Sequence, residues 1–168
     1  MMSSDVAGAV RVARAAARYE WTWTRANLIR FCENLGWEAS DTEDGVTVTT
    51  NLVVRKPTAM IYLDAAALAD LEEFDQDLLE VVVIVARAES SETSAATQSC
   101  FTRIAAALST TLGPGTHSYP SGEPAPAWDL EKVFIRLGMV PGLIGLYLVN
   151  PAYQASIDAF QDEHDIDD

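Results

Sequence analysis

The chain has few of the residues from which most catalytic and metal sites are built. Its 168 residues include two histidines, His117 and His164, and two cysteines, Cys32 and Cys100. No Cys-x-x-Cys pair, Gly-x-Ser-x-Gly elbow, phosphate-binding loop or Gly-x-Gly-x-x-Gly motif occurs. Because acid–base, nucleophilic and metal-ligating groups do not converge in any motif, we expect no catalytic residue, no metal site and no cofactor. We therefore expect a protein that is not an enzyme.

Long apolar runs are also missing. The longest run, residues 81–86, is far too short to cross a bilayer, and arginines interrupt the apolar residues near the N-terminus, unlike in a signal peptide. We therefore predict a cytoplasmic protein whose two cysteines are buried apolar side chains rather than a disulfide. A chain of this length has room for one domain, expected over residues 1–168, with an acidic tail at 161–168.

Positive charge is scarce and concentrated near the start of the chain. The formal net charge is −14, but residues 1–30 hold five arginines and two acids, a net of +3, and the rest carries −17. Such a field repels nucleic acid and anionic membranes, so we expect neither as a partner. The acidic excess either serves solubility or attracts a basic protein partner. The early arginines (Arg11, Arg14 and Arg18) could hold a partner, but we expect them to meet the chain's own acidic surface.

Three of the four tryptophans lie within 17 positions, at Trp21, Trp23 and Trp37. Thr24 is a suitable first residue for a helix that Gly36 ends. Trp23 then stands just before the helix and Trp37 just after it, where apolar residues commonly fold back onto helix ends. This spacing predicts a core and capping cluster, although an exposed aromatic binding edge remains open.

Hydrophobic periodicity predicts an α+β fold. Two helices come first, the second between Thr24 and Gly36, and further helices are expected at 91–112 and 152–160. Residues 40–45 and 113–126 are expected to be loops. The expected strands are 46–54, 59–63, 79–86, 127–137 and 143–149. The order α-α-β-β-β-α-β-β-α indicates a mostly antiparallel five-stranded sheet with helices packed on one face.

The densest acidic run lies between residues 70 and 80, where carboxylates alternate with large apolar side chains. Either these apolar residues anchor a solvated connection to the core, or the run is a mixed acidic and aromatic face that docks a basic protein. Acidic groups would accelerate association, and an aromatic residue would supply the contact that dominates affinity. The candidate partner-binding residues are Glu72, Glu73, Phe74, Asp75 and Asp77.

Several short motifs resemble those of an actinobacterial single-domain family of unknown function. They are Trp21-x-Trp23, Leu35-Gly36-Trp37 and, more weakly, the run 148–150 before Pro151. The likeness extends over residues 19–155 and implies a stand-alone bacterial cytoplasmic domain, without catalytic residues to carry over. Nine arginines against two lysines fit a GC-rich genome. The order of elements also resembles that of type III secretion chaperones.

Acidity, the mixed run at 70–80 and the missing catalytic motifs together favour a protein-binding function. The leading hypothesis is an immunity-type protein that neutralises a cognate, basic bacterial toxin by occlusion. The alternative is a secretion chaperone or adaptor for an exported protein. A third hypothesis is an enzyme of unfamiliar design that uses carboxylates of the acidic run.

Overall fold

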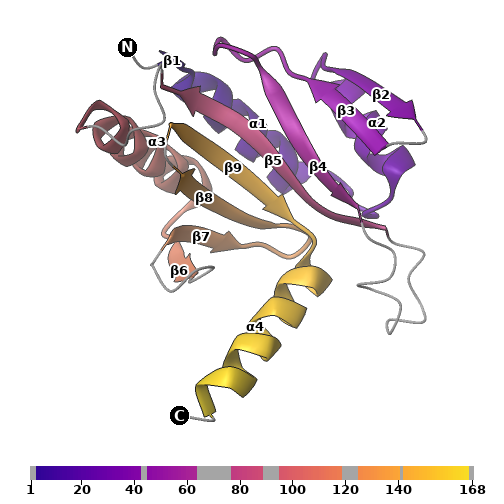
Figure 1. Cartoon of the computed structure of the whole chain (residues 1–168), viewed down its shortest axis with the longest axis vertical. Coiled ribbons are helices and arrows are strands. Elements are labelled where there is room, and N and C mark those ends of the chain that lie inside the picture. Colours follow the sequence, from indigo (N-terminus) through magenta and orange to yellow (C-terminus); the bar gives the residue numbers. More distant parts are fainter. Residues whose placement is uncertain are drawn as a thin grey trace.

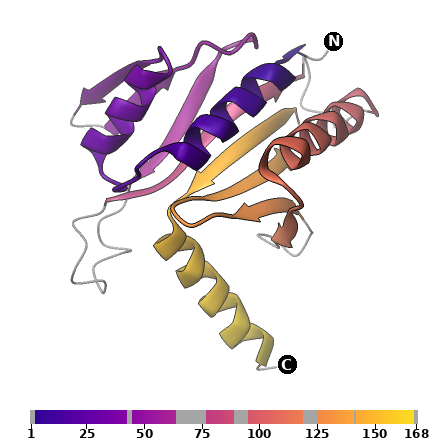
Figure 2. The same cartoon turned by 180° about the vertical axis from the view of Figure 1, so that it is seen from behind.

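The computed structural model describes residues 3–42, 45–63, 77–88, 95–118, 125–140 and 142–166. In these residues an antiparallel sheet carries three helices on one face, and a fourth helix leaves one end of the sheet (Figures 1 and 2). The helices are α1 (Val6–Arg18), α2 (Arg25–Asn34), α3 (Ala95–Leu112) and α4 (Pro151–Ile166). The predicted α+β class is confirmed, and three of the four helices lie on one face as expected.

The sheet has more strands than the five predicted. Its order is β2-β3-β4-β5-β9-β8-β7-β6, with β1 (Ser3–Ser4) paired to the end of β5, and every pairing is antiparallel. The other strands are β2 (Glu38–Thr42), β3 (Gly45–Thr49), β4 (Thr58–Leu63), β5 (Leu78–Arg87), β6 (Thr116–Ser118), β7 (Ala125–Asp129), β8 (Phe134–Val140) and β9 (Leu143–Val149).

Besides the two-residue strand β1, three differences account for the extra strands. Residues 40–45, predicted as a loop, belong partly to β2, an edge strand with four of its five residues exposed and thus no apolar alternation. The expected loop at 113–126 contains β6. The expected strand at 127–137 is two strands, β7 and β8, joined where the Leu130 amide donates to the Val133 carbonyl at 3.1 Å. The expected strands 46–54 and 59–63 correspond to β3 and β4, which pair antiparallel, although β3 ends at Thr49.

The helix ends follow from local hydrogen bonds. Asp5 caps α1, because its carboxylate accepts from the Gly8 amide at 2.8 Å. Thr24 caps α2 as predicted, through a bond from the Asn27 amide. Gly36 has a φ of +76° after this helix, and the next amide then donates back to the Cys32 carbonyl at 2.8 Å.

The tryptophans form the predicted core and capping cluster. Trp21 and Trp23 stack with their ring centroids 4.5 Å apart, and Trp37 meets Phe31 edge-on at 6.0 Å. All three indoles are buried, and each indole N–H has a hydrogen-bond acceptor. The Trp23 indole reaches the Lys132 carbonyl, so the cluster links α2 to the β7–β8 turn.

Apolar side chains also fill both faces of the central strand, β5, whose residues 81–86 are buried as predicted. Both cysteines are buried and unbonded, and burial raises the pKa of the Cys32 thiol to about 12. Across the described parts of the chain, no helix is both long enough and apolar enough to span a membrane.

Candidate binding surface

The predicted acidic run is described only at its end. Glu72, Glu73, Phe74 and Asp75 lie outside the described residues, whereas Asp77 immediately precedes β5. The Asp77 carboxylate accepts from Nε of Arg25 at 3.2 Å, and the same guanidinium contacts Asp41 of β2 at 3.2 Å. Arg25, at the start of α2, therefore holds both Asp41 of β2 and Asp77, which directly precedes β5. Asp77 anchors the end of the acidic run to α2.

A cavity of about 300 Å³ lies beside this anchor. Its walls combine the apolar side chains of Ile61 and Leu63 with Arg25, and the remaining lining comes from the β2–β3 hairpin: Thr42, Gly45, Val46 and Thr47. Leu63, the last described residue before Asp77, lines this cavity. Arg25, which also lines it, holds Asp77.

The sheet face opposite α1, α2 and α3 carries a second group of candidate residues. Met60 and Tyr62 of β4 are 40% and 47% exposed, respectively, although both are large and largely apolar. Tyr62 pairs across the sheet with Glu80 of β5, and Met60 pairs with Val82. Among the described helices, α4 reaches this face at its start, where Tyr153 packs against the small apolar cluster of Ala127, Phe134 and Val149. We call this side of the sheet the open face.

The centre of the open face is a half-buried cluster of charged and aromatic groups. Arg136 of β8 approaches the Glu80 carboxylate at 3.5 Å, and its guanidinium carbon lies 4.4 Å from the centre of the Tyr147 ring. Burial raises the pKa of Glu80, and the positive charge of Arg136 opposes that rise. Burial likewise raises the pKa of Tyr147, again opposed by Arg136. The cluster therefore contains one ion pair and one cation–π contact on a nearly neutral patch.

Two glycines hold the Tyr147 ring against the sheet. A Cβ atom on Gly138 would lie 2.7 Å from Cε1 of Tyr147, and one on Gly145 would lie 2.9 Å from Val82 and 3.2 Å from the same ring atom. No larger residue fits at either position without moving the ring. The ring therefore lies flat across β8 and β9, where Arg136 can contact it.

Chemically, these groups suit recognition better than bond cleavage. Tyrosine and arginine are enriched at the energetic centres of protein interfaces, because each combines a large contact area with hydrogen-bond donors. Within the described residues, no three histidine, cysteine, aspartate or glutamate side chains gather as metal ligands. The open-face residues were not selected from the sequence, since only strand register brings positions 62, 80, 136 and 147 together.

A family model matches residues 7–150, most of the chain. The chain belongs to a family of unknown function, DUF6301. The predicted membership in a family of unknown function is thus confirmed, while the actinobacterial source stays a prediction. No curated protein and no solved structure matches the chain.

Proposed function

We propose that this chain is a non-catalytic protein-binding domain that receives a basic protein, and that this partner is a bacterial toxin neutralised by occlusion. The observation that carries the proposal is the position of the exposed Tyr62 and Met60. They lie on β4, the strand that precedes the acidic run in the sequence, and Tyr62 pairs with Glu80, the last carboxylate of that run. Exposed apolar area and negative charge are therefore neighbours on β4 and β5.

The two parts of this surface act at different stages of binding. The net charge of −17 on residues 31–168 attracts a basic partner over distances of about a Debye length, near 8 Å at physiological salt. The partner then covers Tyr62 and Met60, and burial of these side chains slows its dissociation. Asp77, which is held by Arg25, fixes where the acidic run returns to the sheet.

The first experiment is affinity capture of the tagged protein from its native cells at low and moderate salt. The expected partner is a stoichiometric basic protein whose toxicity disappears when the two proteins are produced together. Capture of an acidic or non-toxic partner would contradict the toxin hypothesis.

The second experiment measures association and dissociation of that partner with matched variants. Glu72→Ser, Glu73→Ser and Asp75→Ser, combined in one chain, should slow association and reduce its salt dependence. Tyr62→Ser should mainly accelerate dissociation. The control combines Glu33→Ser, Glu38→Ser and Glu131→Ser, exposed acids placed elsewhere that give the same charge change. If this control slows association equally, net charge rather than the acidic run attracts the partner.

A secretion chaperone or adaptor is the second candidate function. In its favour is edge strand β2, whose outer side is not paired in the described sheet and which could add an extended cargo segment. Hydrogen exchange distinguishes the two functions. An added cargo strand should protect β2 amides, whereas a folded toxin on the open face should leave their exchange unchanged.

A further inference from the structure

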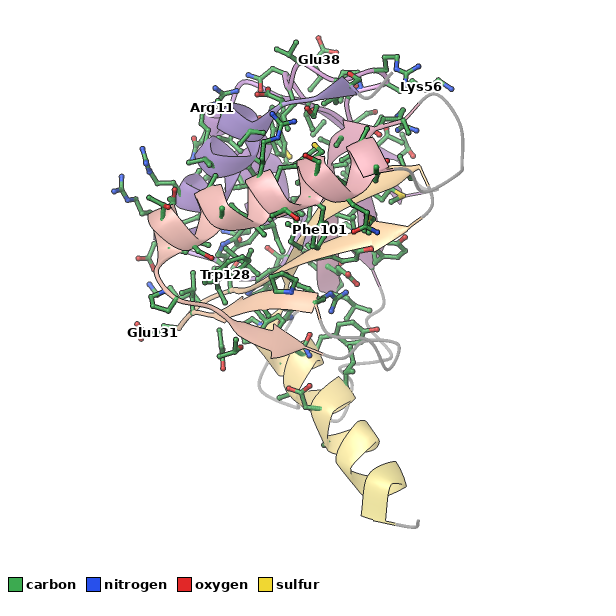
Figure 3. The ribbon with its side chains drawn as sticks, turned by 90° about the vertical axis from the view of Figure 1, so that its left-hand side faces the viewer. Arg11, Glu38, Lys56, Phe101, Trp128 and Glu131 are labelled. Atoms are coloured by element: carbon green, nitrogen blue, oxygen red, sulfur yellow. The ribbon has the colours of Figure 1, made fainter. Side chains whose placement is uncertain are left out.

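The outer surface of α1 and α3 is positively charged in an otherwise strongly acidic protein. The two helices lie side by side (Figure 2) and contain four arginines without a single acidic residue. Arg11, Arg14 and Arg18 of α1 and Arg103 of α3 are all exposed. Figure 3 labels Arg11 at the outer side of the helical layer.

The early arginines were expected to meet the chain's own acidic surface, and the structure differs. Among the described residues, the ion pairs of arginine and lysine involve Arg25, Lys132 and Arg136, with no bond from Arg11, Arg14 or Arg18. The three α1 arginines therefore form a row of charges, which we call the arginine row, without an ion-pair partner among the described residues.

Helix α4 has the opposite character. After its first turn it extends away from the sheet and from α1 (Figures 1 and 3), and Asp158 is exposed on it. The 16 residues of α4 include no lysine or arginine. Aspartates stand at positions 158, 162 and 165, and intervals of four and three residues place these positions along one side of a helix.

The two rows have matching intervals when the helices run in opposite directions. From Arg18 the arginine row continues after four residues to Arg14 and after three more to Arg11. Positions 158, 162 and 165 repeat the same intervals, so at about 1.5 Å per residue both rows span roughly 10 Å. Because α4 extends away from α1 of its own chain, the acidic positions of α4 can meet the arginine row only on α1 of a second copy.

We propose that two copies of the chain associate by laying α4 of each copy antiparallel along α1 of the other. Residue 158 then faces Arg18, residue 162 faces Arg14 and residue 165 faces Arg11. Reciprocal exchange makes the contact twice about a two-fold axis, the commonest symmetry of soluble dimers. Ile157, which is half-buried in the single chain, adds apolar contact next to the charged pairs.

The net negative charge of each copy repels the other and opposes this association, but salt shortens the range of that repulsion. At physiological ionic strength, repulsion between charges farther apart than about 8 Å is largely screened, whereas the facing charges are in contact. Very high salt weakens the facing pairs as well. Dimerisation is therefore expected to be strongest at intermediate salt, with losses at both extremes.

Charge reversal tests the proposal with sedimentation velocity on the whole chain at about 1–100 µM. One variant combines Arg11→Glu, Arg14→Glu and Arg18→Glu, and the other combines Asp158→Arg, Asp162→Arg and Asp165→Arg. Each variant alone should dimerise at least about tenfold more weakly than the wild type, because like charges then face each other. An equimolar mixture of the two should recover a dimer, since opposite charges face each other again in the mixed pair.

Circular dichroism of each variant confirms that it is folded, and the mixture is the matched control because it contains the same substitutions. A wild type that stays monomeric up to 100 µM between about 50 and 300 mM salt overturns the proposal, as does a mixture without dimers. Equal dimerisation of the wild type and both variants overturns it too. Binding of a basic toxin is measured separately, so failure of either proposal leaves the other distinguishable.

Discussion

The two faces of the sheet differ in what they contribute. The face under α1, α2 and α3 holds the stacked tryptophans and the main apolar core, whereas the open face holds Glu80, Arg136 and exposed Tyr62. Strand β5 belongs to both, since Val81 and Val83 point into the core and Glu80 points to the other side. One face therefore holds most of the buried core, whereas the other exposes large side chains to solvent.

The largest expected effect is on the helix-covered face. Phe31→Ala should lower the free energy of unfolding by about 3–5 kcal/mol, because Phe31 is 1% exposed and contacts Tyr19, Trp21 and Trp37. Urea denaturation followed by tryptophan fluorescence measures the change. Met60→Ala on the open face is the matched control, with an expected loss below about 1 kcal/mol. Equal losses would contradict the division between the faces.

The second effect concerns the ion pair of the open face. Arg136→Met leaves the buried Glu80 carboxylate without its positive neighbour and should reduce stability by about 2 kcal/mol at neutral pH. The double variant Glu80→Gln, Arg136→Met should lose less than the sum of the two single variants. Strict additivity in a double-mutant cycle would show that the two side chains do not interact.

The same pair predicts a pH dependence. Because burial raises the folded-state pKa of Glu80 above its usual value of 4.5, the native chain retains this proton at pH values where the unfolded chain has lost it. The Glu80 contribution to stability therefore falls as pH rises from the usual value to the raised one. Arg136→Met should extend this interval upward, and Glu80→Gln should remove the Glu80 contribution. Urea midpoints between pH 4 and pH 8 test both expectations.

A smaller effect is expected from the glycine beneath the Tyr147 ring. Gly138→Ala places a Cβ atom 2.7 Å from that ring and should lower stability by about 1–2 kcal/mol. Replacing the ring through Tyr147→Leu in the same chain should recover part of this loss. If it recovers nothing, contact with the ring is not the cause of the loss.

The smallest expected effect on stability is that of Tyr62→Ser. The side chain is 47% exposed, so unfolding should change by about 0.5 kcal/mol or less, while dissociation of the proposed basic partner accelerates. Thermal denaturation and binding kinetics, measured on the same preparation, distinguish the effect on stability from the effect on dissociation. A large loss of stability with unchanged binding kinetics would show that Tyr62 stabilises the fold and does not contact the partner.

Prediction succeeded for α2 and for β5, where the capping and apolar signals are strong. Thr24, Gly36 and the tryptophans around them marked α2 and its cluster, and the apolar run 81–86 marked the central strand. Strand β2 has neither signal, because both sides of an edge strand can be exposed and polar. The β7–β8 turn contains no glycine or proline, so the sequence predicts a single strand where the structure has two.

The open-face cluster could not be predicted from local sequence. Tyr62, Glu80, Arg136 and Tyr147 are spread over 86 residues, and each is unremarkable beside its chain neighbours. Their proximity depends on the register of β4, β5, β9 and β8, which is set by tertiary pairing. The acidic run was recognisable from composition alone, but the Arg25 bond that anchors Asp77 was not.

The pairing of β5 with β9 also has a consequence for synthesis on the ribosome. Strand β5 is complete at Arg87, but its partner β9 is complete only at Val149. At about 5–20 residues per second, this buried central strand waits several seconds with one edge unpaired. An open apolar edge can pair with other chains, so nascent protein is most prone to aggregate in this interval. Translation that stalls between the two strands should therefore yield insoluble chains.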